Sequence, residues 1–211
     1  MLVGGLSTDI TDTEEIIRLL SARRQVVAFD NRGAGRSDKP DTPYSIQSMA
    51  EDACAVLKAS GHPSADVVGI SMGGRIALEL AIVHPEVVNH LALVSTSARV
   101  SPGISRKLLY LLVEGPRRMG TWRSRYPQPA FAYRRQREAS QSYDATKNLP
   151  AIRAPTLILH GRKDRFAPLD LAEEMHRGIV SSKMVTFDGG HLYPFFHPNE
   201  FAQAVDGFLA S

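Results

Sequence analysis

The fold is decided by Asp66-Val67-Val68-Gly69-Ile70-Ser71-Met72-Gly73-Gly74, which continues into the helix-forming run Arg75-Ile76-Ala77-Leu78-Glu79-Leu80-Ala81. A short β-branched run enters a serine that has a glycine two positions away on each side, and helix formers follow. This pattern is typical of a nucleophile elbow, in which a strand turns sharply into a helix and presents a serine hydroxyl. Ser71 is therefore the predicted nucleophile.

Length and composition predict one ordinary globular domain. The chain has 211 residues, of which 43% are hydrophobic and 22% charged. No apolar run approaches the 18 residues of a membrane span, and residues 1–5 do not resemble a signal peptide. The single cysteine, Cys54, excludes an intramolecular disulfide and is expected to pack in a helix. We expect a cytoplasmic protein with no membrane span.

Short apolar runs alternate with longer helical runs along the chain. Strands are expected at 25–30, 66–70, 90–95, 156–160 and 183–187, with helices at 13–24, 45–60, 72–84, 170–179 and 198–209. Such alternation predicts an α/β fold with a mostly parallel sheet. In these sheets the reactive groups lie just beyond the carboxyl ends of the strands.

Two later loops offer partners for the serine. A serine hydroxyl needs a base within hydrogen-bond reach, and the base needs an acid to orient it. On this elbow the chain order is serine, acid, histidine. Asp164 and His191 each follow a predicted strand in that order, so they are the predicted acid and base. Asp170 and Asp188 remain alternative acids.

An acyl-transfer site also needs donors for the developing oxyanion. One is expected to be the backbone N–H of Met72, the residue after the nucleophile. The other should come from the loop after an early strand, and Val3-Gly4-Gly5-Leu6 is the candidate. The predicted oxyanion hole is therefore formed by Met72 N–H and Leu6 N–H.

Several motifs around these residues together resemble the α/β-hydrolase family, and the likeness covers nearly the whole chain. They are Asp30-Asn31-Arg32-Gly33-Ala34-Gly35-Arg36-Ser37-Asp38, the turn His84-Pro85-Glu86, the acid segment 155–164 and Gly190-His191. The Ser-Met-Gly-Gly elbow is similar to those of enol-lactonases, cofactor-free perhydrolases and C–C bond hydrolases. The resemblance implies a hydrolase core at 1–97 and 151–211 with a short helical lid at 98–150.

The sequence departs from the family pattern at its start. The family usually has two strands before the one that carries the oxyanion loop, so the first strands of the usual sheet are expected to be missing. Gly4-Gly5 stands where the family usually has His-Gly. An exposed edge at the short first strand would suit a partner chain, which suggests a homo-oligomer.

The lid segment is strongly basic, with eleven Lys or Arg against three Asp or Glu in residues 98–150. This charge is interpreted as a solvated outer face, with steering of an anionic substrate as the alternative. The apolar run 108–113 is expected to pack over the pocket, although a partner or membrane-surface contact is the alternative. No nucleic-acid-reading module surrounds the basic residues, so nucleic acid is not an expected partner.

These observations predict a serine hydrolase that cleaves an ester, a lactone or a similar acyl compound. The expected partner is a small-molecule acyl substrate. A C–C bond hydrolase or a perhydrolase on the same triad is an alternative, and a catalytically inactive ligand-binding or signalling protein is another. No cofactor is implied, and the histidines show no metal-ligand spacing. His160, inside a predicted strand, is interpreted as a packed histidine.

Overall fold

A computed structural model describes residues 1–100 and 125–210. Its sheet has six parallel strands in the order β2-β1-β3-β4-β5-β6. The strands are β1 Leu2–Val3, β2 Ala28–Phe29, β3 Ala65–Ile70, β4 Val88–Val94, β5 Thr156–Gly161 and β6 Ser182–Phe187. The predicted α/β-hydrolase fold class, with a parallel sheet flanked by helices, is confirmed.

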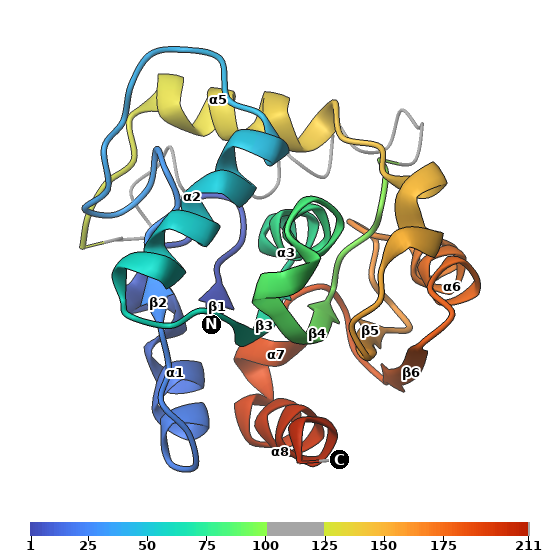
Figure 1. The fold of residues 1–211 in the computed structure, drawn as a ribbon. Helices are drawn as coiled ribbons and strands as arrows, with labels where there is room; N and C mark the ends of the chain where they lie inside the picture. The colour runs from blue at the N-terminus through green and yellow to red at the C-terminus, as the bar shows by residue number, and fades with distance from the viewer. Residues whose placement is uncertain (101–124, 211) are drawn as a thin grey trace.

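Helices cover both faces of the sheet (Figure 1). On one face lie α2 Ile46–Ala59, α3 Met72–Val83 and α6 Leu169–Gly178; on the other lie α1 Glu14–Ser21 and α8 Pro198–Leu209. Shorter pieces are η1 Ile10–Thr13, η2 Pro85–Val87, η3 Thr146–Ala151 and α7 Tyr193–Phe196. The helix α5 Ala130–Gln141 lies across the end of the molecule toward which β1, β3 and β4 point.

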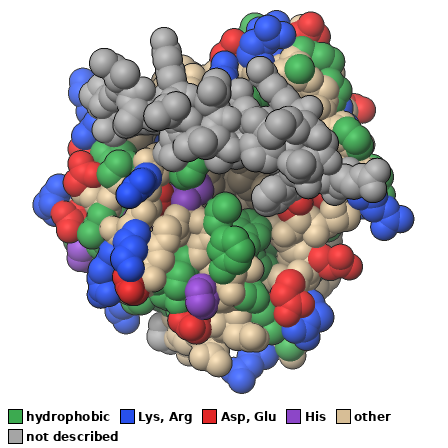
Figure 2. Space-filling view, turned by 180° about the vertical axis from the view of Figure 1, so that it is seen from behind, with side chains coloured by type: hydrophobic (Ala, Val, Ile, Leu, Met, Phe, Trp, Pro, Cys, Tyr) green, Lys and Arg blue, Asp and Glu red, His purple; other side chains and the backbone are tan. Residues whose placement is uncertain are grey.

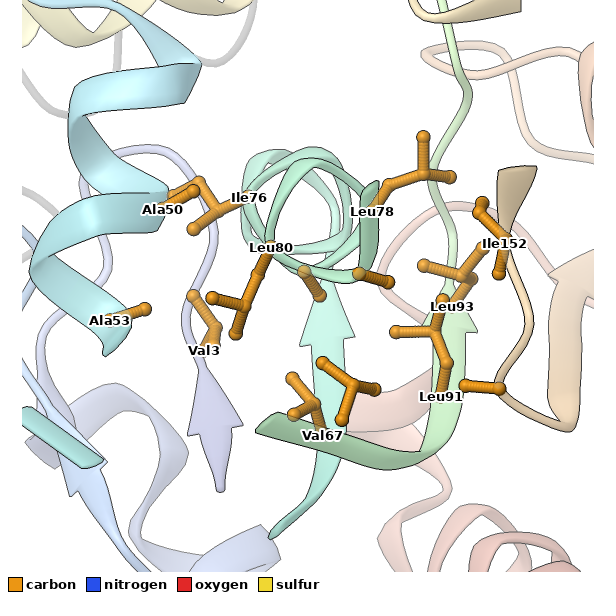
Figure 3. Packing of buried hydrophobic residues seen from close by; sticks show 14 of the residues in the cluster. Val3, Ala50, Ala53, Val67, Ile76, Leu78, Leu80, Leu91, Leu93 and Ile152 are labelled. Atoms are coloured by element: carbon orange, nitrogen blue, oxygen red, sulfur yellow. The ribbon is translucent and has the colours of Figure 1, made fainter. Parts of the chain in front are cut away.

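Successive residues of a strand pack into two separate cores, one on each face of the sheet. Leu91 and Leu93 of β4 pack with α2 and α3, while Ala92 and Val94 pack with α1 and α8. Figure 3 shows Leu80 of α3 packed in the first of these cores, near the strands. Full burial of such an aliphatic side chain contributes about 1.5–3 kcal/mol. The paired cores hold the central strands, and therefore their carboxyl ends, in fixed register.

The edge of the sheet lies elsewhere than predicted. Pairing of the second strand covers only Ala28 and Phe29, and both are half-buried, whereas a buried strand was expected over 25–30. The reason is that β2 is the edge strand and has a neighbour on one side only. The expectation of an exposed edge at the first strand is therefore wrong, because β1 lies between β2 and β3.

The predicted lid is described only in part. Residues 101–124, including the apolar run 108–113, lie outside the described residues. The described part contains α5 and η3, and α5 is tied to α3 by Arg75, whose Nη1 donates to Ser140 O at 2.6 Å. Within 1–100 and 125–210, no helix has both the length and the hydropathy to cross a membrane.

Candidate active site

Ser71 occupies the junction between β3 and α3 in a rare backbone conformation. Its φ is 56° and its ψ is −118°, a region that L-residues seldom adopt and that costs about 1–3 kcal/mol. The surrounding structure holds this conformation, because Ser71 N donates to Val94 O at 2.9 Å and Thr96 Oγ1 donates to Ser71 O at 2.7 Å. The turn aims the Ser71 side chain outward from the end of the sheet.

The glycines of the elbow allow backbones to meet closely. A Cβ atom on Gly69 would lie 2.4 Å from Gly73 O. One on Gly73 would lie 2.1 Å from Val3 O and 2.5 Å from Gly4 O. Side chains at these positions would push α3 away from β3 and β1. The glycines that identify the elbow in the sequence are therefore required by the close approach of helix and strands.

The structure brings the three predicted catalytic side chains into one hydrogen-bonded chain. Ser71 Oγ lies 2.9 Å from His191 Nε2, and His191 Nδ1 lies 2.8 Å from Asp164 Oδ2. Asp164 follows β5 and His191 follows β6, so parallel neighbours bring them to the same end of the sheet. With the Nδ1 proton shared with the carboxylate, Nε2 is left to accept the serine proton.

Asp164 is held in one orientation by its surroundings. Its side chain is fully buried, and its Oδ1 accepts from Phe166 N at 2.8 Å and Ala167 N at 2.9 Å. These two bonds from the backbone, together with the bond to His191, fix the orientation of the carboxylate. The alternative acids do not take this place: Asp188 pairs with Lys163 at the surface, and Asp170 is exposed at the start of α6.

His160 lies next to Asp164, and it makes a polar contact in addition to packing in the core. It is fully buried, its Nε2 donates to Ala167 O at 2.7 Å, and the same nitrogen is 3.6 Å from Asp164 Oδ2. Burial lowers the pKa of His160, so the imidazole stays neutral. Its bond to Ala167 O braces the turn that donates to Asp164. Sequence reasoning assigned His160 to packing alone, since a strand histidine carries no pattern that marks such a role.

The loop after β1 lies beside the nucleophile. A Cβ atom on Gly5 would lie 3.4 Å from Ser71 Cβ and 3.4 Å from Ile70 O. The loop is held because Asn31 Nδ2 donates to Gly4 O at 2.9 Å and Thr8 Oγ1 donates to Gly5 O at 2.8 Å. The predicted donor Leu6 is therefore in the segment that passes Ser71.

The other predicted donor, Met72, is the first residue of α3. The first N–H groups of a helix have no acceptor within it and carry the positive end of the helix dipole. Met72 directly follows Ser71, so this end of the helix lies beside the predicted nucleophile.

One residue at this loop was missed by sequence reasoning. Gln136 of α5 is fully buried, and its Oε1 accepts from Ser7 N at 3.0 Å. The contact joins positions 129 apart in the chain. No local pattern signals it, although a glutamine on the buried face of an amphipathic helix is itself an unusual feature.

A hollow of about 410 Å³ lies behind the histidine. His191 is part of its wall, Ser71 is not, and its apolar side chains include Phe166 and the 75% exposed Phe196. Figure 2 shows hydrophobic side chains gathered near the middle of one face, close to histidines. The hollow borders the base rather than the nucleophile.

Comparison with known proteins gives consistent results. The model of a family described as the alpha/beta hydrolase family matches residues 3–204. A protein of Azorhizobium caulinodans, provisionally named the carbamate hydrolase RutD, is 29% identical over 91% of this chain and 83% of its own length. The 2-hydroxymuconate semialdehyde hydrolase of Pseudomonas putida is 30% identical over 90% of this chain and 78% of its own.

Solved structures agree at the level of the fold. The enol-lactonase of Burkholderia xenovorans superimposes with a TM-score of 0.87 at 23% identity, covering 100% of this chain and 90% of that one. The family match spans most of the sequence, and the relatives bear the names of hydrolases. The chain therefore belongs to the alpha/beta hydrolase family and is a hydrolase.

Proposed function

We propose that this chain is a serine hydrolase that cleaves an ester, a lactone or a similar acyl compound through an acyl-enzyme. The observation that carries this proposal is the chain of hydrogen bonds from Ser71 Oγ to His191 (2.9 Å) and from His191 to Asp164 (2.8 Å). A serine hydroxyl becomes a competent nucleophile when a neutral imidazole at this distance takes its proton.

In the first step, Ser71 Oγ attacks the carbonyl carbon while His191 Nε2 takes the hydroxyl proton. Asp164 stabilises the imidazolium that forms, and it is itself held by Phe166 N and Ala167 N. The tetrahedral oxyanion is stabilised by Met72 N–H and Leu6 N–H. His191 then returns the proton to the leaving group, and the acyl group remains on Ser71.

In the second step, water takes the place of the leaving group. His191 accepts a proton from the water, whose oxygen attacks the acyl carbon, and Ser71 regains its proton as the acid departs. Each half of the reaction needs the same oxyanion donors. Removal of one such donor from related sites costs about 10²–10³-fold in kcat.

The same groups could also support cleavage of a C–C bond. The relative that is 30% identical is named for 2-hydroxymuconate semialdehyde, a substrate of that kind, and this favours C–C hydrolysis as the second candidate. In both cases the substrate is a small carbonyl compound. We assign α5, in the described part of the predicted lid, to the cover of this substrate, because α5 reaches the loop beside Ser71 through Gln136.

The test is hydrolysis of p-nitrophenyl esters of increasing chain length, with 2-hydroxymuconate semialdehyde measured in parallel. Ser71→Ala is expected to lower kcat by about 10⁴-fold or more, since the nucleophile is lost. The matched control is Ser21→Ala, which changes an exposed serine in α1. Unchanged turnover in Ser71→Ala would contradict the proposal, and turnover of the semialdehyde alone would favour the second candidate.

A further inference from the structure

We propose that Gln136, in α5, is a positioning residue for the oxyanion hole: it holds the Gly5–Ser7 turn so that Leu6 N–H faces the reacting carbonyl oxygen. This inference rests on the proposed serine-hydrolase function. It assigns a role in the reaction to a side chain that lies far along the chain from Ser71, outside the nucleophile, the base and the acid.

Both polar atoms of the Gln136 amide make hydrogen bonds. Its Oε1 accepts from Ser7 N at 3.0 Å and from Gln128 Nε2 at 3.0 Å, and its Nε2 donates to Arg32 O at 2.8 Å. The residue is 0% exposed. A buried amide with both ends bonded has one orientation, and the groups that it contacts are fixed with it.

The Ser7 contact acts at a sensitive point of the loop. Ser7 has a φ of 60°, a left-handed conformation that L-residues rarely adopt. Its N–H belongs to the peptide unit that directly follows Leu6, so fixing this N–H restricts rotation about the Leu6 backbone. The Leu6 N–H lies one peptide unit earlier, next to Gly5, and a Cβ atom placed on Gly5 would lie 3.4 Å from Ser71 Cβ. Gln136 therefore limits the directions in which Leu6 N–H can point.

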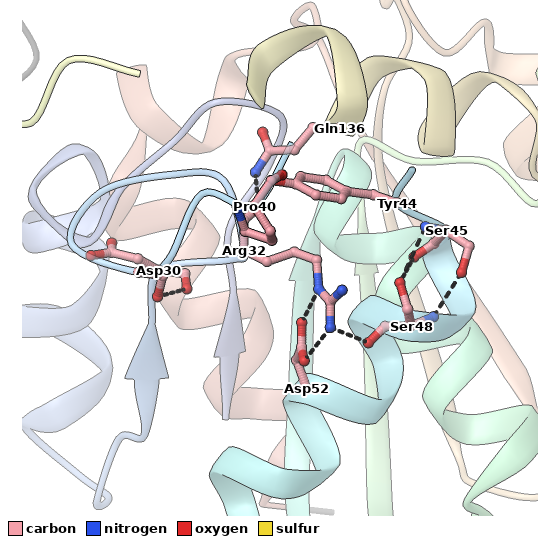
Figure 4. Close-up of polar contacts among 9 residues, drawn as sticks. Asp30, Arg32, Pro40, Tyr44, Ser45, Ser48, Asp52 and Gln136 are labelled. Atoms are coloured by element: carbon pink, nitrogen blue, oxygen red, sulfur yellow. Dashed lines mark hydrogen bonds and ion pairs between the residues drawn. The ribbon is translucent and has the colours of Figure 1, made fainter. Parts of the chain in front are cut away.

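The other end of the bridge is rigid. Arg32 Nη2 donates to Asp52 Oδ1 of α2 at 2.6 Å. The Cζ atom of Arg32 lies 5.8 Å from the centre of the Tyr44 ring. Figure 4 shows this ion pair together with the bond from Gln136 to the Arg32 backbone. The Gly5–Ser7 turn is thus connected through Gln136 and Arg32 to a well-packed helix.

Loss of this bridge should affect the transition state more than the bound substrate. An oxyanion donor works because it is already oriented when charge develops, and a small displacement weakens it. Without the amide of Gln136, Ser7 N–H loses this acceptor and Arg32 O loses this donor, so the turn is held less firmly. Substrate binding through its apolar parts would be little changed.

The experiment compares Gln136→Met, which keeps the length of the side chain and removes the amide, with wild type. The first readout is kcat and KM on a p-nitrophenyl ester. The second is Ki for an alkyl trifluoromethyl ketone, to which Ser71 Oγ would add, with the carbonyl electron pair becoming the oxyanion and the serine proton passing to His191. We expect kcat/KM to fall and Ki to rise by the same factor, about tenfold or more, with KM changed less than threefold.

Two variants on the same helix control for a merely structural effect. Gln141→Met changes an exposed glutamine and should leave both readouts unchanged. Ser140→Ala removes the hydroxyl that accepts from Arg75 Nη1 at 2.7 Å and should lower Tm without raising Ki. If Gln136→Met does not fold, Gln128→Met carries the test, because it removes one donor to the same Oε1 atom, and Ki should rise about threefold.

A Ki in Gln136→Met equal to that of wild type would overturn the inference. The same holds for Gln128→Met if that variant is used instead. A rise in Ki that Ser140→Ala reproduces would overturn it as well, since docking of α5 alone would then explain it. These outcomes leave the proposed function standing. A wild-type protein that neither hydrolyses the ester nor binds the ketone would overturn both.

Discussion

The two halves of the candidate site are built in different ways. The nucleophile half consists of Ser71, Asp164 and His191, each of which lies in the loop or turn after a strand of the parallel sheet. The oxyanion half is the loop Gly4–Ser7, which is held by side chains from elsewhere, including Gln136, 129 positions away from Ser7. The first half is fixed by the geometry of the sheet, and the second by side-chain contacts from Thr8, Asn31 and Gln136. The difference is that the loop after β1 is held in part by a helix far along the chain, whereas the three other side chains lie at strand ends.

The largest effect is expected where the two halves of the site touch, at Gly73 of α3. Gly73 lies against Val3 O and Gly4 O, so Gly73→Ala places a methyl group into backbone at 2.1 Å and 2.5 Å. Because neither α3 nor β1 can move freely, we expect a loss of about 3 kcal/mol in the free energy of unfolding. Urea unfolding followed by circular dichroism measures this loss.

The matched control for that variant is Gly207→Ala. Gly207 lies within α8, and no atom lies within 4 Å of a Cβ placed there. A glycine inside a helix costs roughly 0.5–1 kcal/mol relative to alanine, so this variant should be more stable than wild type by about that amount. Equal unfolding curves for the two variants would show that the contact of α3 with β1 is not tight.

Much of the nucleophile half could be predicted from the sequence. The elbow has a local signature, since strand formers, spaced glycines and helix formers each follow from the backbone that the turn requires. Asp164 and His191 could be placed because parallel strands bring their following loops to one edge. The fold class followed from the same alternation of strands and helices.

The oxyanion half could be predicted only as a segment. The sequence indicated the loop at Gly4–Leu6, but no local pattern predicted that Gln136 contacts this part of the chain. The edge of the sheet was misplaced because the run 25–30 is apolar enough for a buried strand, whereas its pairing partner β1 has only two residues. Contacts between positions far apart in the chain depend on how the elements pack. The periodicity within one segment does not predict them.

A smaller effect is expected from His160, which should make the free energy of unfolding depend on pH. Burial lowers the pKa of His160 below its usual 6.5, so the folded protein keeps this imidazole neutral while the unfolded chain protonates it below about pH 6.5. The unfolded state then binds more protons, and the contribution of His160 to stability falls as the pH falls. In His160→Phe this dependence is absent.

The measurement is the difference in unfolding free energy between wild type and His160→Phe at pH 7.5 and at pH 5.5. We expect the advantage of wild type to shrink by roughly 1 kcal/mol over this interval, within the limit of about 1.4 kcal/mol per pH unit for one group. A difference that stays constant with pH would show that His160 titrates alike in both states.

The most direct test of the central claim is labelling of the whole chain with a fluorophosphonate, followed by mass mapping of the modified peptide. We expect one adduct per chain, on Ser71, and a labelling rate that falls by about 10⁴-fold in Asp164→Asn, because the histidine is then held in the wrong tautomer. An adduct on another serine, or equal labelling rates for wild type and Asp164→Asn, would contradict it.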